Sequence, residues 1–394
     1  MSLSVTQTQP DLDTFASREH GQWTLIPQQE VDDWNRRLVA TDAHFRQYPY
    51  WHEPYRQIGA RVYYLVYKVD AIPIFYAAMV LRGWTRLPFG LVQRGPVSLI
   101  HGVQPTREIL MALGQVAKSL GCIGLRFTHS DPQVMQLASS LPGSVRRELC
   151  PFYRDPPRSL FVIQHESDAA TQTAFQPVAR REIKAAIRAG YEIRVSDAPD
   201  ALADAWPMLE SLASSKKFKL SDRPRSGWLE MMEIARRHDC ARLYSACLNG
   251  RCVEHILVAR YGAIAEYLLG ALDVAALHGA PSPSCLIHWT AMREFYRQGC
   301  TVYNLGGPGN VNIGNTVYQF KRKFRPTLFT ADPPVTLALR PAICRLWIDV
   351  CLRTFSSYRF VRCRLFPLKT LPARVAARLQ RVLRPTSSLG ESET

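Results

Sequence analysis

The sequence lacks several patterns that would assign a function directly. It contains no Walker A, GxSxG or HExxH motif, which argues against a P-loop, a serine hydrolase elbow and a zinc protease site. No apolar run approaches the roughly 20 residues that a membrane-spanning helix needs. Residues 1–20 are polar, with neither a basic nor an apolar region, so we expect a disordered N-terminus and no signal peptide.

Cysteine pairs with metal-binding spacing are also missing. The ten cysteines are scattered and include no CxxC, which predicts a reduced, cytoplasmic chain. Cys247, Cys252 and His255 lie close together in the sequence, but they fall across a predicted hairpin with ordinary core residues between them. We therefore predict no metal site.

Acidic residues are outnumbered by basic ones. The 394 residues include 49 Lys and Arg against 33 Asp and Glu, a net charge of +16. Residues 336–394 hold eleven of the basic and three of the acidic residues, which is half of that excess. Such a balance favours a polyanionic partner: nucleic acid, an anionic membrane surface or a phosphorylated substrate. The chain length predicts two domains.

One unit is predicted twice along the chain. In each copy a β-hairpin is followed by a helix, a Gly-Cys pair and a further strand. The hairpins turn near Asp70 and at Asn249, 179 residues apart, and the Gly-Cys pairs begin at Gly121 and Gly299, 178 residues apart. This order of elements is that of the GNAT (acyl-CoA N-acyltransferase) fold. We therefore predict an α+β chain with tandem GNAT-like domains at residues 21–160 and 161–335 and a basic helical tail at 336–394.

The segment from Tyr303 to Phe324 is the most informative one. A predicted strand ends in Gly306-Gly307, and glycines allow a ligand to approach the backbone closely. An aromatic and basic cluster with Phe320 and Lys321 follows. A cation beside aromatic rings suits a site at which negative charge develops during a reaction. A glycine-rich turn before a solvated basic edge is the alternative interpretation.

A basic helix is predicted from Arg180 to Ala189, with Ile183, Ala186 and Ile187 as its apolar stripe. Its basic face is either solvated or a ridge that follows the phosphates of a tRNA. That face carries Arg180, Arg181, Lys184 and Arg188.

Taken in order, these motifs resemble the FemAB family, the tandem-GNAT aminoacyltransferases that build peptide cross-bridges on cell-wall precursors. The resemblance covers roughly residues 40–330. It rests on Arg94-Gly95-Pro96, Arg180-Arg181 with Ile183-Lys184-Ala185 and Gly190, Glu266-Tyr267-Leu268 with Gly270, Pro283-Ser284 with Trp289, Tyr303 to Gly307, and Phe320-Lys321 with Phe324.

The resemblance implies an acyltransferase that moves an aminoacyl group from aminoacyl-tRNA to an amine of a cell-envelope precursor or peptide. The tRNA is then a co-substrate, no cofactor stays bound, and the acceptor is phosphate- or lipid-linked. The resemblance implies two catalytic residues. Lys321 would stabilise the oxyanion or the tRNA end, and Tyr267 would line the cleft. For substrate binding the implied residues are Arg94, Lys216, Lys217, Arg223, Arg225, Trp228, Phe320, Gly306 and Gly307.

The chain departs from the family pattern in one place. The family often has an acidic residue just after the Arg-Gly-Pro turn, whereas here Ser98 and Leu99 follow it. Two other interpretations therefore stay open. One is a GNAT N-acyltransferase that uses acetyl-CoA or another acyl-CoA on an envelope or exopolysaccharide precursor, although no pyrophosphate-binding Arg/Gln-x-x-Gly-x-Gly/Ala loop is evident. The other is a non-catalytic protein that binds RNA or a membrane.

The tail has amphipathic helical patterns of its own. Ile343, Trp347 and Val350 recur at helical spacing among arginines, and later Arg374 and Arg378 share one face. Such helices suit an anionic lipid surface, an RNA backbone or packing on the protein's own domain. We expect a cytoplasmic protein with peripheral contact at the inner face of the membrane.

Overall fold

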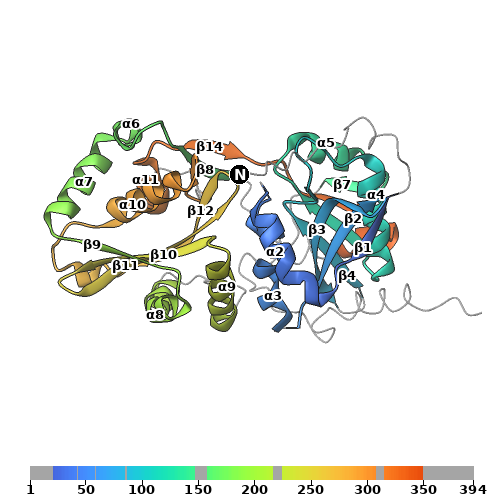
Figure 1. Ribbon diagram of the computed structural model, residues 1–394, viewed down its shortest axis with the longest axis horizontal. Coiled ribbons are helices and arrows are strands. Elements are labelled where there is room, and N and C mark those ends of the chain that lie inside the picture. The colour runs from blue at the N-terminus through green and yellow to red at the C-terminus, as the bar shows by residue number, and fades with distance from the viewer. Residues whose placement is uncertain are drawn as a thin grey trace, which may run out of the picture.

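The protein consists of two β-sheets, each flanked by helices (Figure 1). We describe a computed structural model of the chain. The structure describes residues 21–41, 43–57, 59–84, 87–146, 158–215, 224–307 and 315–348. The expected disordered N-terminus at residues 1–20 lies outside these ranges.

The first sheet has the strand order β1-β2-β3-β4-β6-β15-β7, and β5 pairs with β3. Its only parallel pair among the described strands is β4 with β6. The bounds are β1 Gln22–Leu25, β2 Arg61–Val69, β3 Ile72–Trp84, β4 Leu87–Gln93, β5 Val97–Ser98, β6 Gly124–Thr128, β7 Ser144–Arg146 and β15 Val335–Ala338.

The second sheet has the order β14-β8-β13-β12-β11-β10-β9. Here β12 and β13 form the parallel pair. The bounds are β8 Arg158–Ile163, β9 Glu192–Ser196, β10 Ala241–Leu248, β11 Arg251–Tyr261, β12 Ile264–Leu272, β13 Val302–Asn304 and β14 Thr327–Thr330.

Helices cover both faces of each sheet, because every sheet face is apolar and must be buried. Against the first sheet, α4 packs on one face and α2 and α3 on the other; against the second, α7 and α10 pack on one face and α8 and α9 on the other. The bounds are α2 Val31–Val39, α3 Pro49–Gln57, α4 Arg107–Ser119, α5 Pro132–Ser140, α6 Asp168–Ala174, α7 Pro177–Arg188, α8 Pro199–Ser215, α9 Arg225–Arg237, α10 Ser284–Arg297 and α11 Thr316–Arg322, with short 3-10 turns η1 Gln28–Glu30, η2 Phe45–Gln47 and η3 Ala275–Leu277.

The predicted repeat is confirmed. The order β2-β3-β4-α4-β6 recurs as β10-β11-β12-α10-β13. The hairpin turns place Asp70 and Asn249 at φ 50° and 51°, and the two helices are followed by Gly121 and Gly299 at φ 85° and 91°. A positive φ is the conformation that these turn and capping positions require, which is why the sequence could show them.

The predicted domain boundaries differ from the structure at both ends of the second domain. The boundary expected between residues 160 and 161 falls inside β8, which lies wholly in the second sheet. The chain also returns to the first domain after β14. Strand β15 inserts between β6 and β7, with Val335 opposite Phe127 and Leu337 opposite Leu125. The segment from 335 therefore completes the first domain.

The start of the predicted tail packs on the first domain as well. Residues 341–348 are helical, and Cys344 and Trp347 are buried against Phe89 and Ile123. This part of the amphipathic pattern is therefore satisfied by the protein's own core. Residues 349–394, where the remaining tail patterns fall, lie outside the described residues.

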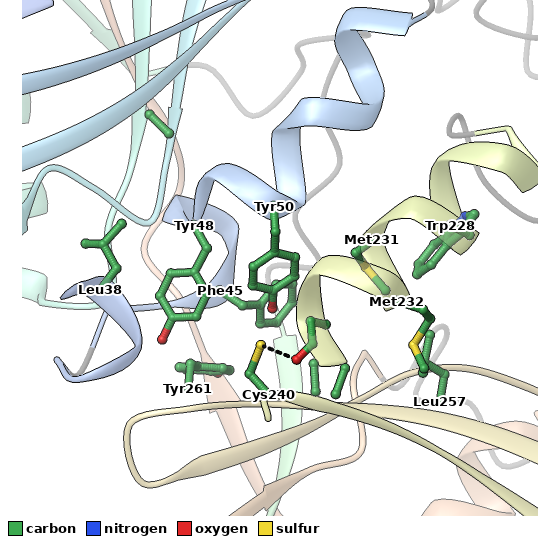
Figure 2. Packing of buried hydrophobic residues seen from close by; sticks show 14 of the residues in the cluster. Leu38, Phe45, Tyr48, Tyr50, Trp228, Met231, Met232, Cys240, Leu257 and Tyr261 are labelled. Atoms are coloured by element: carbon green, nitrogen blue, oxygen red, sulfur yellow. Dashed lines mark hydrogen bonds between the residues drawn. The ribbon is translucent and has the colours of Figure 1, made fainter. Parts of the chain in front are cut away.

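The two domains share one hydrophobic cluster. Figure 2 shows side chains of the first domain, including Phe45 and Tyr50, facing Met231, Leu257 and Tyr261 of the second. The Phe45 and Tyr261 rings meet edge to face with centroids 5.5 Å apart. The interface is therefore a continuous core that both sheets help to build.

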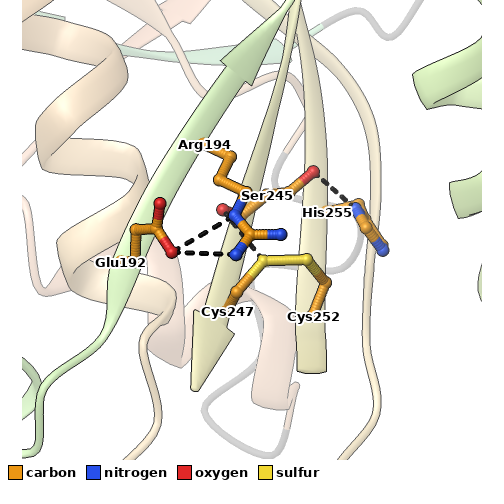
Figure 3. The surroundings of a disulfide bond; sticks show 6 residues. All are labelled: Glu192, Arg194, Ser245, Cys247, Cys252 and His255. Atoms are coloured by element: carbon orange, nitrogen blue, oxygen red, sulfur yellow. Dashed lines mark hydrogen bonds and ion pairs between the residues drawn. A yellow bond between two sulfur atoms is a disulfide. The ribbon is translucent and has the colours of Figure 1, made fainter. Parts of the chain in front are cut away.

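The expectation of a wholly reduced chain is wrong for one pair of cysteines. Cys247 and Cys252 form a disulfide across the β10–β11 hairpin (Figure 3). An irregularity in β10 before Cys247 places the two residues directly opposite each other, with Cα atoms 3.8 Å apart. Sequence spacing alone does not reveal such a register shift. The Ser245 hydroxyl and the His255 Nδ1 form a separate hydrogen bond, 2.8 Å long.

Candidate active site

The candidate active site lies where β12 and β13 separate. The two strands pair from Ile264 with Val302 to Glu266 with Asn304, and no further. Beyond that point β13 stays with β8, because Leu305 N–H donates to the Leu160 carbonyl. The result is an opening between two neighbouring strands of the sheet, with backbone groups of both strands at its edges.

Helix α11 brings Lys321 to this opening. Its Nζ donates a hydrogen bond of 2.8 Å to the Gly307 carbonyl. A Cβ atom at Gly306 would lie 3.8 Å from this Nζ and 3.7 Å from the Tyr267 carbonyl oxygen, so the Lys321 ammonium and the β12 backbone both lie beside Gly306. Gly306 has φ 75°, which favours glycine there. The lysine is 7% exposed, and burial lowers its pKa to about 8.

Aromatic rings surround the lysine on the α10 side of the sheet. Its Nζ lies 5.9 Å from the centroid of the Tyr267 ring. His288 of α10 packs edge to face on Tyr267, at 4.9 Å, and tilted against Phe320, at 5.5 Å. The His288 Nδ1 lies 3.0 Å from the Tyr303 hydroxyl. Burial, assisted by the Lys321 charge, lowers the pKa of His288 to about 3, so this imidazole is neutral.

A buried carboxylate lies on the opposite face of β12, toward the first domain. Glu266 accepts a hydrogen bond of 2.9 Å from the Asn304 amide and one of 3.4 Å from the Tyr261 hydroxyl. Two side chains of the first domain face it: His44 at 3.7 Å and Arg46 at 4.0 Å. Burial and the nearby arginines lower the pKa of His44. Glu266 is therefore held by both domains.

A second buried carboxyl group lies at the start of α10. The Ser284 hydroxyl lies 2.8 and 2.9 Å from the two carboxyl oxygens of Glu254 and donates to them. Burial raises the pKa of Glu254 to about 8, and the Ser284 hydrogen bond opposes that rise. A carboxyl group of the protein itself is thus bonded to the side chain of the first residue of α10.

The corresponding parallel pair of the first domain is closed. Beyond the last β4–β6 pair, Gly95 N–H donates to the Thr128 carbonyl at 3.1 Å and Arg94 N–H donates to the Thr128 hydroxyl at 3.0 Å. Arg94 itself has φ 57°. Its positive charge acts to lower the pKa of His44 and that of Tyr261. The predicted Arg94 therefore lies near the Glu266 cluster, and not at the Lys321 opening.

Several predicted binding residues lie elsewhere. Trp228 is buried in the shared interdomain core, where it packs on Trp51 at 5.9 Å, so it presents no surface to a substrate. Arg225, at the start of α9, is exposed and donates to the Ala203 carbonyl at 3.1 Å. The predicted residues Lys216, Lys217 and Arg223 lie outside the described residues.

The predicted basic helix is confirmed as α7. Arg181, Lys184 and Arg188 are exposed, while Arg180 is partly buried and donates to the Thr173 carbonyl at 3.2 Å. The predicted apolar stripe is wrong in one member, since Ile187 is 58% exposed. The helix lies on the outer edge of the second domain (Figure 1), and its Glu182 carboxylate accepts a hydrogen bond of 2.7 Å from the Lys323 ammonium, directly after α11.

Sequence reasoning assigned no site role to three polar residues, although Glu266 and Asn304 stand in motifs that carry the resemblance. His288 stands inside an apolar helix face, where a histidine is usually a core residue. Glu266 and Asn304 lie within strands as single polar residues among apolar ones. Their strand positions, which end the parallel pairing, are the signal that could have identified them, but that signal requires the register.

Comparisons with known proteins agree with this geometry. Residues 175–322 match a family model described as the acetyltransferase (GNAT) domain. The solved structure of FemX superposes with a TM-score of 0.68 at 14% identity, covering 82% of this chain and 99% of that chain. The protein is an acyltransferase with the GNAT fold.

A conserved protein of unknown function from Bacteroides thetaiotaomicron VPI-5482 superposes on the acyltransferase with a TM-score of 0.53. The identity is 11%, and the match covers 80% of this chain and 99% of that chain. At such identities the likeness shows the fold. Comparison with curated protein sequences finds no match.

Two further observations concern the acyltransferase as a whole. None of the helices in the described part of the chain combines the length and the apolar character needed to cross a membrane. Within the same residues, no three His, Cys, Asp or Glu side chains are grouped so that they could hold a metal ion.

Proposed function

We propose that the acyltransferase moves an aminoacyl group from aminoacyl-tRNA to an amine of a cell-envelope precursor or peptide. The observation that carries the proposal is the placement of Lys321. It is a buried cation at the opening of a parallel strand pair, beside two glycines and an aromatic ring, in the second of two tandem GNAT-like domains. The FemAB-like motifs around Tyr303 to Phe324 supply the residues of this same opening.

The reaction is aminolysis of an ester. The acceptor nitrogen attacks the ester carbonyl carbon, a carbon–nitrogen bond forms, and the bond from carbon to the ribose oxygen breaks. The nitrogen loses a proton, which the leaving ribose oxygen takes up directly or through water. Lys321 is the group that would stabilise the oxyanion of the tetrahedral intermediate. With a pKa of about 8, it is mostly charged at neutral pH.

The start of α10 favours aminoacyl-tRNA over acyl-CoA as donor. GNAT enzymes that use CoA bind its pyrophosphate with backbone amides at the opening of a helix. In this protein the side chain of Ser284, the first residue of α10, is bonded to Glu254. A carboxyl group in that place would repel a diphosphate when ionised, and it takes up the hydroxyl donor when neutral.

The alternative is an acyl-CoA-dependent N-acyltransferase on an envelope or exopolysaccharide precursor. The description of the matching family model, an acetyltransferase domain, favours it. Both donors would deliver an acyl carbonyl to the same opening. Lys321 would then stabilise the same kind of oxyanion, and the two proposals differ in the group that leaves.

The acceptor and the place of action follow from charge. A chain with a net charge of +16 suits a phosphate- or lipid-linked acceptor at the inner face of an anionic membrane. The exposed basic residues of α7 are available for a polyanion. We propose a cytoplasmic enzyme in peripheral contact with the membrane, acting in cell-wall biogenesis.

The first experiment measures donor binding by the full chain: charged tRNA, uncharged tRNA and acetyl-CoA, titrated across salt. We expect charged tRNA to bind more tightly than uncharged tRNA at every salt concentration. In turnover assays with the preferred donor, Lys321→Ala should lower kcat roughly 100-fold. The matched control is Lys118→Ala, an exposed lysine on α4 of the first domain. Saturable binding of acetyl-CoA, together with equal binding of charged and uncharged tRNA, would overturn the aminoacyl proposal.

A further inference from the structure

A series of hydrogen bonds within the second domain connects Glu266 to Lys321 by way of the Gly306-Gly307 backbone. Glu266 accepts from the Asn304 amide at 2.9 Å, and Asn304 Oδ1 accepts from Gly306 N–H at 2.8 Å. The next residue, Gly307, accepts from Lys321 Nζ at 2.8 Å. The series therefore runs from the face of β12 that lies toward the first domain to the strand opening at Lys321.

Two side chains of the first domain lie close to Glu266, at which this series of hydrogen bonds begins. His44 and Arg46, both at the short η2 turn, face the Glu266 carboxylate. His44 also stacks on Tyr261 at 4.1 Å, and the Tyr261 hydroxyl donates to Glu266. The carboxylate is thus fixed by groups of both domains before it orients Asn304.

Asn304 is placed to act on the glycines. It is 4% exposed and is the last residue of β13 to pair with β12. Gly306 has φ 75°, and its carbonyl accepts a hydrogen bond of 3.1 Å from the Leu160 N–H of β8. The hydrogen bond that the Gly306 N–H donates to the buried Asn304 amide fixes the other side of this residue, so the two bonds together set the direction of the following carbonyl.

We propose that Asn304 and Glu266 are positioning residues for Lys321: they hold the Gly306-Gly307 backbone so that the Gly307 carbonyl fixes the ammonium at the strand opening. The first domain acts on the site through His44 and Arg46. This inference rests on the proposed role of Lys321 and adds residues that touch neither substrate nor reacting atoms.

The first test exchanges the two functional groups. Asn304→Asp keeps an acceptor for Gly306 N–H but places a second carboxylate against Glu266, so kcat should fall roughly 10- to 100-fold with KM changed less than about threefold. Adding Glu266→Gln restores a donor and an acceptor between the two positions. The double variant should recover kcat to within about threefold of the wild type. Failure of the double variant to exceed Asn304→Asp would overturn the proposal.

A matched control separates positioning from loss of a buried amide. Asn35 of α2 is 2% exposed and its Oδ1 accepts from Tyr50 N–H at 2.9 Å, as Asn304 accepts from Gly306. Asn35→Leu and Asn304→Leu each remove a buried acceptor for a backbone N–H, and Asn304→Leu also removes the donor to Glu266. We expect only Asn304→Leu to lower kcat. Equal loss in both folded variants would overturn the proposal.

The second test needs no donor. The rate at which a small amine-reactive reagent labels Lys321, followed by peptide mass spectrometry across pH, reports the pKa of its amine. Tyr267 and His288 face this amine, and Lys323 follows it on the chain. Losing the carbonyl that favours the ammonium should lower the apparent pKa in Asn304→Leu and not in Asn35→Leu. An unchanged or raised pKa would overturn the proposal.

The two tests also separate this inference from the proposed function. If no tRNA or acyl-CoA supports turnover, the proposed function fails. The labelling profile of Asn304→Leu then still decides whether Asn304 positions Lys321.

Discussion

Burial shifts the pKa values of Lys321, Glu254 and His288 in the second domain, with loss of solvation as the largest cause for each. Lys321 and Glu254 both move to about 8, and His288 moves to about 3. Near neutral pH the lysine is therefore mostly charged, the carboxyl group mostly protonated and the imidazole neutral. Each group takes the protonation state that its surroundings stabilise best. Of the three, only the lysine carries a positive charge at the opening.

Glu254 makes stability depend on pH. Its pKa rises from an ordinary value of 4.5 to about 8 on folding, so the folded protein binds the proton more tightly than the unfolded chain. Its contribution is complete below pH 4.5 and is lost as the pH rises toward 8. We expect Glu254→Gln, which cannot ionise, to gain about 2–3 kcal/mol relative to the wild type between pH 5 and pH 7. Urea denaturation at the two pH values measures it.

Comparing the variant with the wild type cancels the effect of the other titrating groups on the free energy of unfolding, because both proteins contain them. Glu210→Gln is a matched control, because this glutamate is exposed on α8 and accepts from the Trp206 indole N–H. Its difference from the wild type should vary little with pH. If Glu254→Gln and the wild type keep a constant difference in free energy of unfolding from pH 5 to pH 7, Glu254 does not have a raised pKa.

At the residue scale, sequence patterns identified the site residues whose chemical type distinguishes them from ordinary core residues. Lys321, Tyr267, Gly306, Gly307 and Phe320 were predicted, and the structure brings all five together at one opening. Their proposed roles stay predictions. Trp228 shows the limit, because an aromatic residue beside a basic loop has the same appearance whether it faces a ligand or fills a core.

At the element scale, β15 is the feature that joins the chain's end to its beginning. It lies between β6 and β7, and Arg126 of β6 donates to the Thr336 hydroxyl 210 residues away. Val335 and Leu337 are buried in the core of the first domain. The first sheet is therefore incomplete until the second domain has been synthesised.

We expect Leu337→Ala to destabilise the first domain by roughly 2–4 kcal/mol, because it leaves a cavity beside α4. The side chain is 3% exposed and lies close to Gly114 of α4. Hydrogen exchange should show lost protection in β4 and β6. The matched control is Leu328→Ala on β14, a leucine that is 47% exposed and should cost less than about 1 kcal/mol. Faster exchange confined to the second sheet would contradict this placement.

The repeat could be predicted because its signals are local. Hairpin turns, helix ends and glycines with positive φ depend on a few neighbouring residues, and the predicted order of hairpin, helix, Gly-Cys pair and strand is found in both domains. The place of β15 could not be predicted, since a four-residue strand carries little pattern and its partners are distant. The same applies to the Cys247–Cys252 register.

At the scale of the whole molecule, the two domains are joined by one core and by one polar cluster. The hydrophobic cluster takes residues from α2, α3, β2 and β3 of the first domain and from α8, α9, β10, β11 and β12 of the second. Glu266 lies beside this cluster and is held from both sides. Packing that sets the distance between the sheets therefore also sets the surroundings of the strand opening.

The shared core predicts one cooperative unfolding transition for the wild type. Phe45 is fully buried and meets Tyr261 across the interface, so Phe45→Ala should cost roughly 3–5 kcal/mol and uncouple the domains. Differential scanning calorimetry should then show two transitions, with a calorimetric enthalpy above the van't Hoff value. Leu113→Ala is the matched control, since Leu113 is equally buried but lies in the first domain's own core on α4. It should lower the melting temperature and leave a single transition. A single transition in Phe45→Ala would mean that other contacts suffice to couple the domains, whereas two transitions in the wild type would show that the shared core does not make them one folding unit.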